Sequence, residues 1–279
     1  MSTTLDADHL NGLPGSRLMA PPPPPELEQR HTIEVVDVHK AFGASQVLNG
    51  LSVNFVDNAI TTVLGPSGTG KSVLLKHIVG LLQPDQGQIR VFGENIWNVS
   101  EAERFELRKR FGVLFQDGAL FGSMNLYDNV AFPLRKHTNK SEDEIREIVM
   151  THLSEVGLEK ATNKAPNEIS GGMRKRAGFA RALVMRPDVV LFDEPDSGLD
   201  PVRTKLLCNL ISEVHKEHGG TYIVITHDIA SARTLSDYIG MLWQGKLAHY
   251  GEADAAFNSD DAFVRQFLAG EADGPLGMD

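Results

Sequence analysis

One segment constrains the fold of this chain more than any other: a glycine-rich loop between an apolar stretch and a helix-forming stretch. The apolar stretch is Ile60–Leu64, and the residues after Lys71 favour a long helix. The loop fits the pattern G-x-x-x-x-G-K-[ST] and comprises Gly65, Pro66, Ser67, Gly68, Thr69, Gly70, Lys71 and Ser72. A strand, this loop and a helix in succession direct backbone N–H groups and the positive end of the helix dipole at an anion. The segment therefore predicts an α/β fold with a phosphate-binding loop.

Two residues of this loop have side chains suited to a magnesium-bound nucleoside triphosphate. We expect the Lys71 ammonium to reach the β- and γ-phosphates and the Ser72 hydroxyl to ligate Mg²⁺. The glycines allow the backbone to curl closely round the phosphate oxygens. A nucleoside triphosphate with Mg²⁺ is the predicted ligand.

Three parts of the chain differ in composition. Residues 1–30 are predicted to be a disordered, proline-rich tail, in which Pro21–Pro25 favours an extended spacer over a ligand for a partner's aromatic groove. Residues 31–251 are predicted to form one domain, and residues 252–279 a C-terminal extension with short amphipathic helices. Within the domain, residues of about 100–186 are dominated by charged, helix-favouring segments and are predicted to be an inserted helical lobe.

Outside that lobe, short apolar segments alternate with turns or helices. Strands alternating with helices predict a mostly parallel core sheet, and the segments before and after the phosphate loop predict a small antiparallel β subdomain. The capping box formed by Ser141 and Glu144 predicts a helix start. The expected strands are Ile33–Val38, Val47–Val56, Ile60–Leu64, Ile89–Phe92, Val189–Phe192, Tyr222–Thr226 and Ile239–Trp243, and the expected helices are Glu101–Arg110, Ser141–Val156, Gly172–Met185 and Pro201–His218.

Two acidic residues follow the apolar stretch Val189–Phe192. A buried strand that ends in Asp193 and Glu194 carries both carboxylates to the carboxyl edge of the sheet, beside the phosphate loop. We expect Asp193 to hold Mg²⁺, mostly through water, and Glu194 to act as the general base on the attacking water. The pair predicts hydrolysis of the nucleotide.

A second possible anion site lies at the start of the helix that follows Ile169. Ser170, Gly171 and Gly172 would present N–H groups at a helix N-terminus, as the first loop does. Two phosphate-binding helix starts for one nucleotide are compatible with a homodimer that shares its sites.

Together these motifs resemble the nucleotide-binding subunits of ABC transporters over nearly all of residues 32–250. The resemblance implies that Ser170 contacts ATP bound to the opposite protomer and that Phe42 stacks on adenine. It also implies that Gln116 senses Mg²⁺ and meets the membrane subunit, that Asp200 lies at the dimer interface and that His227 grips the γ-phosphate. Ile169 and Met173 replace the ends of the usual Leu-Ser-Gly-Gly-Gln signature, so a ribose contact from position 173 is not expected.

Longer segments are similar to the Mce/Mla lipid-transport ATPases, with the Mce-associated (Mkl- or MceG-type) branch nearer than MlaF. The segments are Phe111–Leu134, Ile169–Arg176, Asp193–Thr204 and Val264–Leu268. This resemblance implies a YrbE/MlaE-type permease, MCE-domain proteins in the assembled complex, and a peripheral position on the cytoplasmic face of the inner membrane. Which lipid moves, in which direction and through how many permeases does not follow from an ATPase subunit, which does not touch the cargo.

Composition bears on the competing functions. Lysine and arginine number 27 against 37 aspartates and glutamates, and the net charge of −10 disfavours a nucleic-acid partner. The single cysteine, Cys208, suits a reducing compartment. An ABC importer or exporter for another cargo and, less favoured, a soluble non-transport ABC ATPase remain the alternatives. His215 and His218 have a spacing compatible with a metal site, but a solvated helix face is the preferred interpretation.

Overall fold

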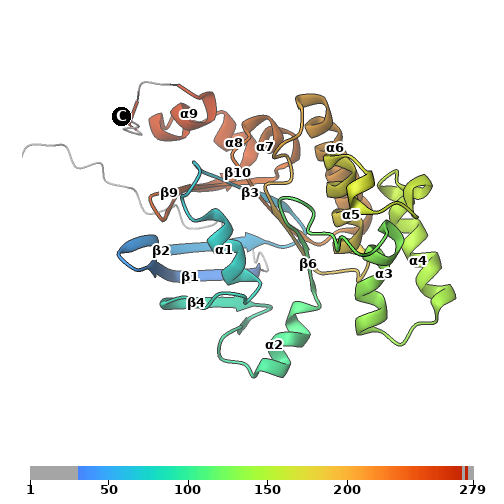
Figure 1. Ribbon diagram of the computed structural model, residues 1–279. Helices are drawn as coiled ribbons and strands as arrows, with labels where there is room; N and C mark the ends of the chain where they lie inside the picture. Colours follow the sequence, from blue (N-terminus) through green and yellow to red (C-terminus); the bar gives the residue numbers. More distant parts are fainter. Residues whose placement is uncertain (1–30, 272–273, 276–279) are drawn as a thin grey trace, which may run out of the picture.

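The computed structural model describes residues 31–271 and 274–275, and in this part of the chain the strands form two sheets (Figure 1). The predicted N-terminal tail with its proline run lies outside the described residues, as do most residues after 271. Among the described residues, no helix combines the length and the apolar character needed to cross a membrane.

The larger sheet has the strand order β10-β9-β3-β8-β7-β6. All its neighbouring strands are parallel except β9 and β10, and every residue of β3 and β8 is buried. Burial on both faces explains why these strands do not alternate between apolar and charged residues in the sequence. The predicted mostly parallel core sheet is thus confirmed, with strands β3 (Ile60–Leu64), β6 (Phe111–Leu114), β7 (Val189–Asp193), β8 (Thr221–Thr226), β9 (Tyr238–Trp243) and β10 (Lys246–Glu252).

The smaller sheet is antiparallel, as predicted, and has the order β2-β1-β4-β5. Its inward side chains share one hydrophobic core with helix α1 (Lys71–Ile78) and with the core sheet. Helix α1 is shorter than expected, because Gly80 adopts a left-handed φ of 70° just after its end. The strands are β1 (His31–Phe42), β2 (Ser45–Val56), β4 (Gln86–Val91) and β5 (Glu94–Asn95).

The helical subdomain lies across the core sheet from α1 and forms the right-hand side of Figure 1. The capping box at Ser141 and Glu144 is present at the start of α4. The helices between residues 100 and 186 are α2 (Glu101–Arg108), α3 (Leu126–His137), α4 (Glu142–Glu155) and α5 (Gly171–Leu183), with single 3₁₀ turns η1 (Glu159–Ala161) and η2 (Pro166–Glu168).

The segment expected to be an inserted helical lobe contains one strand of the core sheet. Strand β6 pairs in parallel with β7 at the edge of that sheet. Gly112 permits this position, because a Cβ atom there would collide with the Ala182 carbonyl oxygen of the adjoining helical segment. The inserted helical part therefore begins after β6.

Of the remaining helices, the first packs with α4 and α5 against β7 and β8, and the others pack against β3 and β9. The C-terminal extension forms two short helices, as expected, and they pack on Leu64, Ile239 and Met241 of β3 and β9. Their contact is thus with the core of their own chain. These helices are α6 (Pro201–His218), α7 (Ile229–Leu235), α8 (Ala253–Phe257) and α9 (Ala262–Ala269).

Candidate nucleotide-binding and hydrolysis site

The phosphate-binding loop connects the carboxyl end of β3 to the first turn of α1. Gly70, the N-cap of α1, has φ 98° and no side-chain capping hydrogen bond, and the first turn holds no acidic residue. A Cβ atom on Gly65 would lie 2.5 Å from the Leu242 carbonyl oxygen, so a larger residue cannot replace this glycine without displacing β9. The loop thus leaves the first-turn N–H groups of α1 available to an anion.

Lys71 lies within this loop and is 4% exposed. Its ammonium donates to the Gly65 carbonyl oxygen at 2.7 Å and to the Pro66 carbonyl oxygen at 2.8 Å. Burial lowers the pKa of Lys71, while the carboxylates of Glu194 and Asp193 act in the opposite direction. The Lys71 ammonium is therefore poorly solvated and bonded to neutral carbonyl oxygens. Anionic oxygens would be stronger acceptors and could replace these carbonyls as its hydrogen-bond partners.

Ser72 and Asp193 come together between α1 and β7. The Ser72 hydroxyl donates to Asp193 Oδ1 at 2.8 Å. A hydroxyl and a carboxylate oxygen at this spacing are hard oxygen ligands of the kind that Mg²⁺ prefers. The donor set fits Mg²⁺, and Ser72 and Asp193 are the residues that would hold it.

Glu194 and His227 form the neighbouring pair at the same edge of the sheet. Glu194 Oε1 lies 3.5 Å from His227 Nδ1, with the glutamate side chain 21% exposed and the histidine side chain 58% exposed. Glu194 has a left-handed φ of 48°, which is unusual for a non-glycine residue, and its N–H donates to the Ile225 carbonyl oxygen at 2.9 Å. This backbone turn directs the carboxylate away from the strand and toward His227.

Ser170, Gly171 and Gly172 begin helix α5, as the sequence indicates. The Ser170 hydroxyl oxygen accepts from the Met173 N–H at 3.3 Å, so this serine caps its own helix. Figure 1 shows α5 in the helical subdomain, on the far side of the core sheet from α1. The structure therefore does not bring the Ser170 segment to the phosphate loop of the same chain.

Lys175 is a site residue that the sequence did not single out, because it is part of the basic run Arg174–Arg176. The run is not simply a solvated face, since each of the three side chains donates to backbone carbonyls. Lys175 is 4% exposed and donates to the carbonyl oxygens of Glu194, at 3.2 Å, and Ser197, at 2.6 Å. Lys175 lies four positions before the buried Phe179, and residues at this spacing share one face of a helix. This spacing is the sequence signal that could have predicted the inward position of Lys175.

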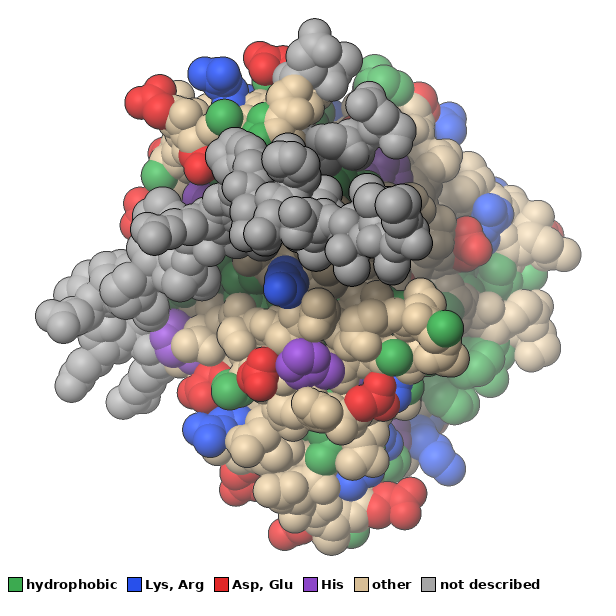
Figure 2. Space-filling model, turned by 90° about the vertical axis from the view of Figure 1, so that its left-hand side faces the viewer, with side chains coloured by type: hydrophobic (Ala, Val, Ile, Leu, Met, Phe, Trp, Pro, Cys, Tyr) green, Lys and Arg blue, Asp and Glu red, His purple; other side chains and the backbone are tan. Residues whose placement is uncertain are grey.

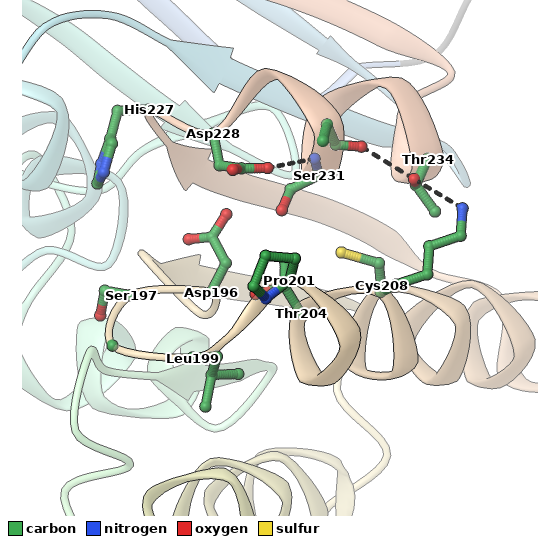
Figure 3. A pocket seen from close by; sticks show the side chains of 13 residues that line it. Asp196, Ser197, Leu199, Pro201, Thr204, Cys208, His227, Asp228, Ser231 and Thr234 are labelled. Carbon is green, nitrogen blue, oxygen red and sulfur yellow. Dashed lines mark hydrogen bonds between the residues drawn. The ribbon is translucent and has the colours of Figure 1, made fainter.

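A hollow of about 270 Å³ lies between residues 196–208 and residues 227–234 (Figure 3). Figure 3 shows the Asp196 side chain pointing from its loop toward α7, and Asp196 Oδ2 accepts from the Thr226 hydroxyl at 2.6 Å. Asp196 Oδ1 has no hydrogen-bond partner among the described residues. Burial raises the pKa of the Cys208 thiol, which also lines the hollow, to about 11, so this cysteine stays protonated.

Three other predicted site residues are on the surface of the chain. Phe42 ends β1 with 51% of its area exposed, as a stacking platform requires. Asp200 caps α6 by accepting from the Arg203 N–H at 3.0 Å. Gln116 is exposed two residues beyond β6 and, within residues 31–271, makes no hydrogen bond with Ser72 or Asp193.

The chain is similar in sequence to known ATP-binding transport proteins. A family model described as "ABC transporter" matches residues 48–197. The "probable ribonucleotide transport ATP-binding protein mkl" of Mycobacterium leprae is 52% identical over 246 residues, which are 88% of this chain and 71% of that protein. The "intermembrane phospholipid transport system ATP-binding protein MlaF" of Escherichia coli K12 is 41% identical over 244 residues, which are 88% of this chain and 91% of that protein.

Solved structures agree with these relatives in fold. CbiO1 from Clostridium perfringens, part of the ABC transporter complex cbiONQ, superposes with a TM-score of 0.76 at 30% identity, over 85% of this chain and 95% of CbiO1. The dimeric ATP-binding cassette MJ0796 bound to ADP and Pi superposes with a TM-score of 0.73 at 28% identity, over 79% of this chain and 98% of MJ0796.

Proposed function

The chain belongs to the ABC transporter family as an ATP-binding subunit whose ATP hydrolysis drives transport, and from this premise we propose that it powers an Mce/Mla-type complex that moves lipids across the cell envelope. The observation that carries the hydrolytic part is the convergence of Ser72, Asp193, Glu194 and His227 at one edge of the core sheet. The cargo rests on the relatives and is argued separately below.

ATP binds through the phosphate loop. The N–H groups of residues 67–72 and the uncapped first turn of α1 surround the β- and γ-phosphates, while Lys71 exchanges its loop carbonyls for phosphate oxygens. Mg²⁺ held by Ser72 and Asp193, with Gln116 approaching when the site closes, would neutralise charge on the β- and γ-oxygens. Phe42, exposed at the end of β1, stacks on the adenine.

Hydrolysis uses the second pair of side chains. Glu194 accepts a proton from the water that attacks the γ-phosphate, because its carboxylate follows directly on that of Asp193, which is already engaged with Ser72 of the phosphate loop. His227 lies 3.5 Å from Glu194 and donates to the γ-phosphate as charge develops. The left-handed backbone at Glu194 holds the carboxylate in this position.

A homodimer completes the site. Ser170, Gly171 and Gly172 lie on the far side of the core sheet from their own α1, so a second copy has to supply them to the nucleotide. Asp200 lies in the loop that would face the partner. MJ0796, which is 28% identical, is dimeric with ADP and Pi bound, and this supports the same arrangement here.

The relatives carry two different cargo names. The Mycobacterium leprae protein is described by ribonucleotide transport and the Escherichia coli protein by intermembrane phospholipid transport. We favour the lipid because the segments Phe111–Leu134 and Asp193–Thr204 resemble the Mce/Mla lipid-transport ATPases, a group in which the sequence analysis places the Mkl-type proteins as well as MlaF. Transport of ribonucleotides is the alternative.

A soluble ABC ATPase that works on DNA or ribosomes is the competing class. The chain has a net charge of −10, whereas phosphate backbones require a basic surface. On the face in Figure 2, acidic and basic side chains are interspersed over the described residues. These observations favour a protein partner over a nucleic acid.

The proposed position is the cytoplasmic face of the inner membrane, through contact with a YrbE/MlaE-type permease. The exposed aromatic residues Phe115 and Phe121 flank the segment that follows Gln116, where ABC subunits meet their permeases. Exposed aromatic side chains are enriched in protein interfaces. This segment is the proposed contact with the permease.

Affinity purification from gently solubilised membranes, followed by mass spectrometry, tests the partner and the cargo class together. The native chain is compared with Phe115→Ser, which alters a ring that is 39% exposed in the proposed contact. Phe105→Ser is the matched control, because Phe105 is 46% exposed but lies on α2, outside the contact.

A permease of the YrbE/MlaE type with MCE-domain proteins is the expected recovery, reduced in Phe115→Ser and retained in Phe105→Ser. Recovery of a permease together with a ribonucleotide-binding protein would contradict lipid transport and support transport of ribonucleotides. Ribosomal or DNA-bound partners without any membrane protein would contradict the transport function.

A further inference from the structure

A cluster of potential metal ligands lies away from the nucleotide site, where the end of α4 meets the end of α6. His152, Glu155 and His218 each offer one ligand atom, and the three atoms lie within 4.8 Å of one another. We propose that these residues form a Zn²⁺ site that links the helical subdomain to α6. The proposal is independent of the transported cargo.

The carboxylate of Glu155 turns one oxygen to each imidazole. Glu155 Oε2 lies 2.7 Å from His152 Nδ1, and Glu155 Oε1 lies 3.5 Å from His218 Nε2. The two imidazole centroids are 5.8 Å apart. Ligands at about 2.0–2.2 Å from a tetrahedral Zn²⁺ lie about 3.3 Å from each other, so small side-chain rotations bring this set into the required geometry. Two imidazoles and one carboxylate suit Zn²⁺ better than Mg²⁺ or Ca²⁺.

Burial and helix dipoles favour a cation at this place. His152 is 5% exposed, and the Glu155 side chain is 17% exposed. Glu155 is the last residue of α4 and His218 the last residue of α6, so two helix C-termini direct their partial negative charge at the cluster. Among the described residues that line the adjoining hollow, Glu217 adds a carboxylate and Arg186 is the one lysine or arginine.

The adjoining hollow leaves room for a further ligand. It has a volume of about 400 Å³ and is lined by His152, His218 and Tyr222, among others. Tyr222 is 1% exposed, and its hydroxyl has no hydrogen-bond partner among the described residues. Burial, reinforced by the charge of Glu155, raises the pKa of Tyr222, so the phenol remains a hydrogen-bond donor. A metal-bound water would give this hydroxyl a partner.

A second histidine–carboxylate pair, which lacks a third ligand, provides a control for the proposed site. His39 Nε2 lies 3.2 Å from Asp37 Oδ1, but the Asp37 side chain is 73% exposed, and neither residue belongs to a three-ligand cluster in the described part of the chain. Replacement of His39 therefore removes a histidine beside a carboxylate without affecting the proposed site. His215, the histidine that the sequence paired with His218, instead lies 3.0 Å from the Gly220 carbonyl oxygen.

Calorimetric titration with ZnCl₂ tests the proposal on the untagged, full-length chain after removal of metal by a chelator. Excess Mg²⁺ and ADP occupy the nucleotide site during the titration. We expect one Zn²⁺ per chain in the micromolar range or tighter, and an affinity at least about 100-fold lower in His218→Ala, since loss of an outer-shell partner alone costs about 10–100-fold. His39→Ala should bind as the native chain does.

Two further readouts separate ligation from a folding defect. Co²⁺ in place of Zn²⁺ should give the intense visible absorption of a four-coordinate site in the native chain and not in Glu155→Gln. Zn²⁺ should raise the Tm of the native chain but not of His218→Ala. No binding in the micromolar range, or equal affinity in the native chain, His218→Ala and Glu155→Gln, would overturn the proposal.

Discussion

Helices α1 and α5 both begin in glycine-rich segments, yet their first turns are satisfied in different ways. At α1, the N-cap is Gly70, no side chain caps the turn, and Lys71 is buried within the loop. At α5, the Ser170 hydroxyl accepts from the Met173 N–H. The first helix start leaves its first-turn N–H groups without a side-chain cap, whereas at the second a side chain already satisfies one of them.

This difference bears on how one nucleotide could use both helices. A serine hydroxyl has two acceptor lone pairs and one donor, so Ser170 can cap α5 and donate to a phosphate oxygen at the same time. The α1 site is thus built for tight binding within one chain, whereas the α5 site suits a contact that forms and dissolves. The predictions below test this contrast, from the largest expected effect to the smallest.

Glu194→Gln should trap the dimer in which unhydrolysed ATP contacts α1 of one subunit and α5 of the other. Turnover is expected to fall at least about 100-fold, because a general base contributes about 10²–10⁴-fold. ATP binding should persist, and the dimer should accumulate during gel filtration with ATP. Near-normal phosphate release by this variant would remove Glu194 from its proposed role.

Lys71→Ala should disable the α1 site alone. Hydrogen bonds from a charged donor contribute about 1.5–3 kcal/mol, so the affinity for ATP is expected to fall about 10–100-fold in an equilibrium binding assay. Lys76→Ala, an exposed lysine on the same helix, is the control and should bind normally. Unchanged affinity in Lys71→Ala would contradict the phosphate-loop assignment.

Ser170→Asp should disable the α5 site without unfolding its helix. Aspartate caps a helix as well as serine does, but it lacks the donor and adds a negative charge beside the γ-phosphate. Turnover and ATP-dependent dimerisation should fall about tenfold or more, with the ATP affinity of the monomer unchanged. Ser170→Ala, which removes the cap, should lower the free energy of unfolding by about 1 kcal/mol. If Ser170→Asp dimerises with ATP as the native chain does, the shared site is wrong.

Gly172→Ala should give the smallest effect, and it should stabilise the fold where the other changes weaken function or stability. A Cβ atom there would lie 3.6 Å from Leu199, an ordinary contact, so alanine should raise the free energy of unfolding by about 0.5 kcal/mol. Gly70→Ala should lower it by at least about 1 kcal/mol, since φ is 98° and the Cβ atom would lie 2.9 Å from Val47 and Leu48. Urea unfolding measures both, and equal effects would remove the structural contrast between the two helix starts.

The parts of the fold that sequence predicts well are those set by local pattern. The phosphate loop, the buried parallel strands and the capping box at Ser141 depend on neighbouring residues. Helix α3 was not predicted, because Pro133 lies inside it and proline disfavours a helix interior. Strand β6 has only four residues, and β10 is a half-buried edge strand, so their patterns are weak.

The site divides in the same way. The meeting of Ser72 with Asp193 follows from the rule that loops after parallel strands gather at one sheet edge. The inward turn of Lys175 and the approach of His152 to His218 depend on packing between segments far apart in the chain. The roles assigned to the site residues, including those of Gln116 and Asp200, stay predictions.

The Lys175 contacts give the proposed dimer a property that neither nucleotide site has alone. Lys175 belongs to the helix that begins at Ser170, yet its ammonium holds the backbone of Glu194 and Ser197 in its own subunit. A displacement of α5 when Ser170 contacts the partner's ATP would therefore shift the backbone of Glu194 and Ser197 in the same subunit. Binding of ATP at one site of the dimer would therefore affect the catalytic loop of the other site, and the two hydrolysis events would be coupled. Replacement of Lys175 would remove this coupling.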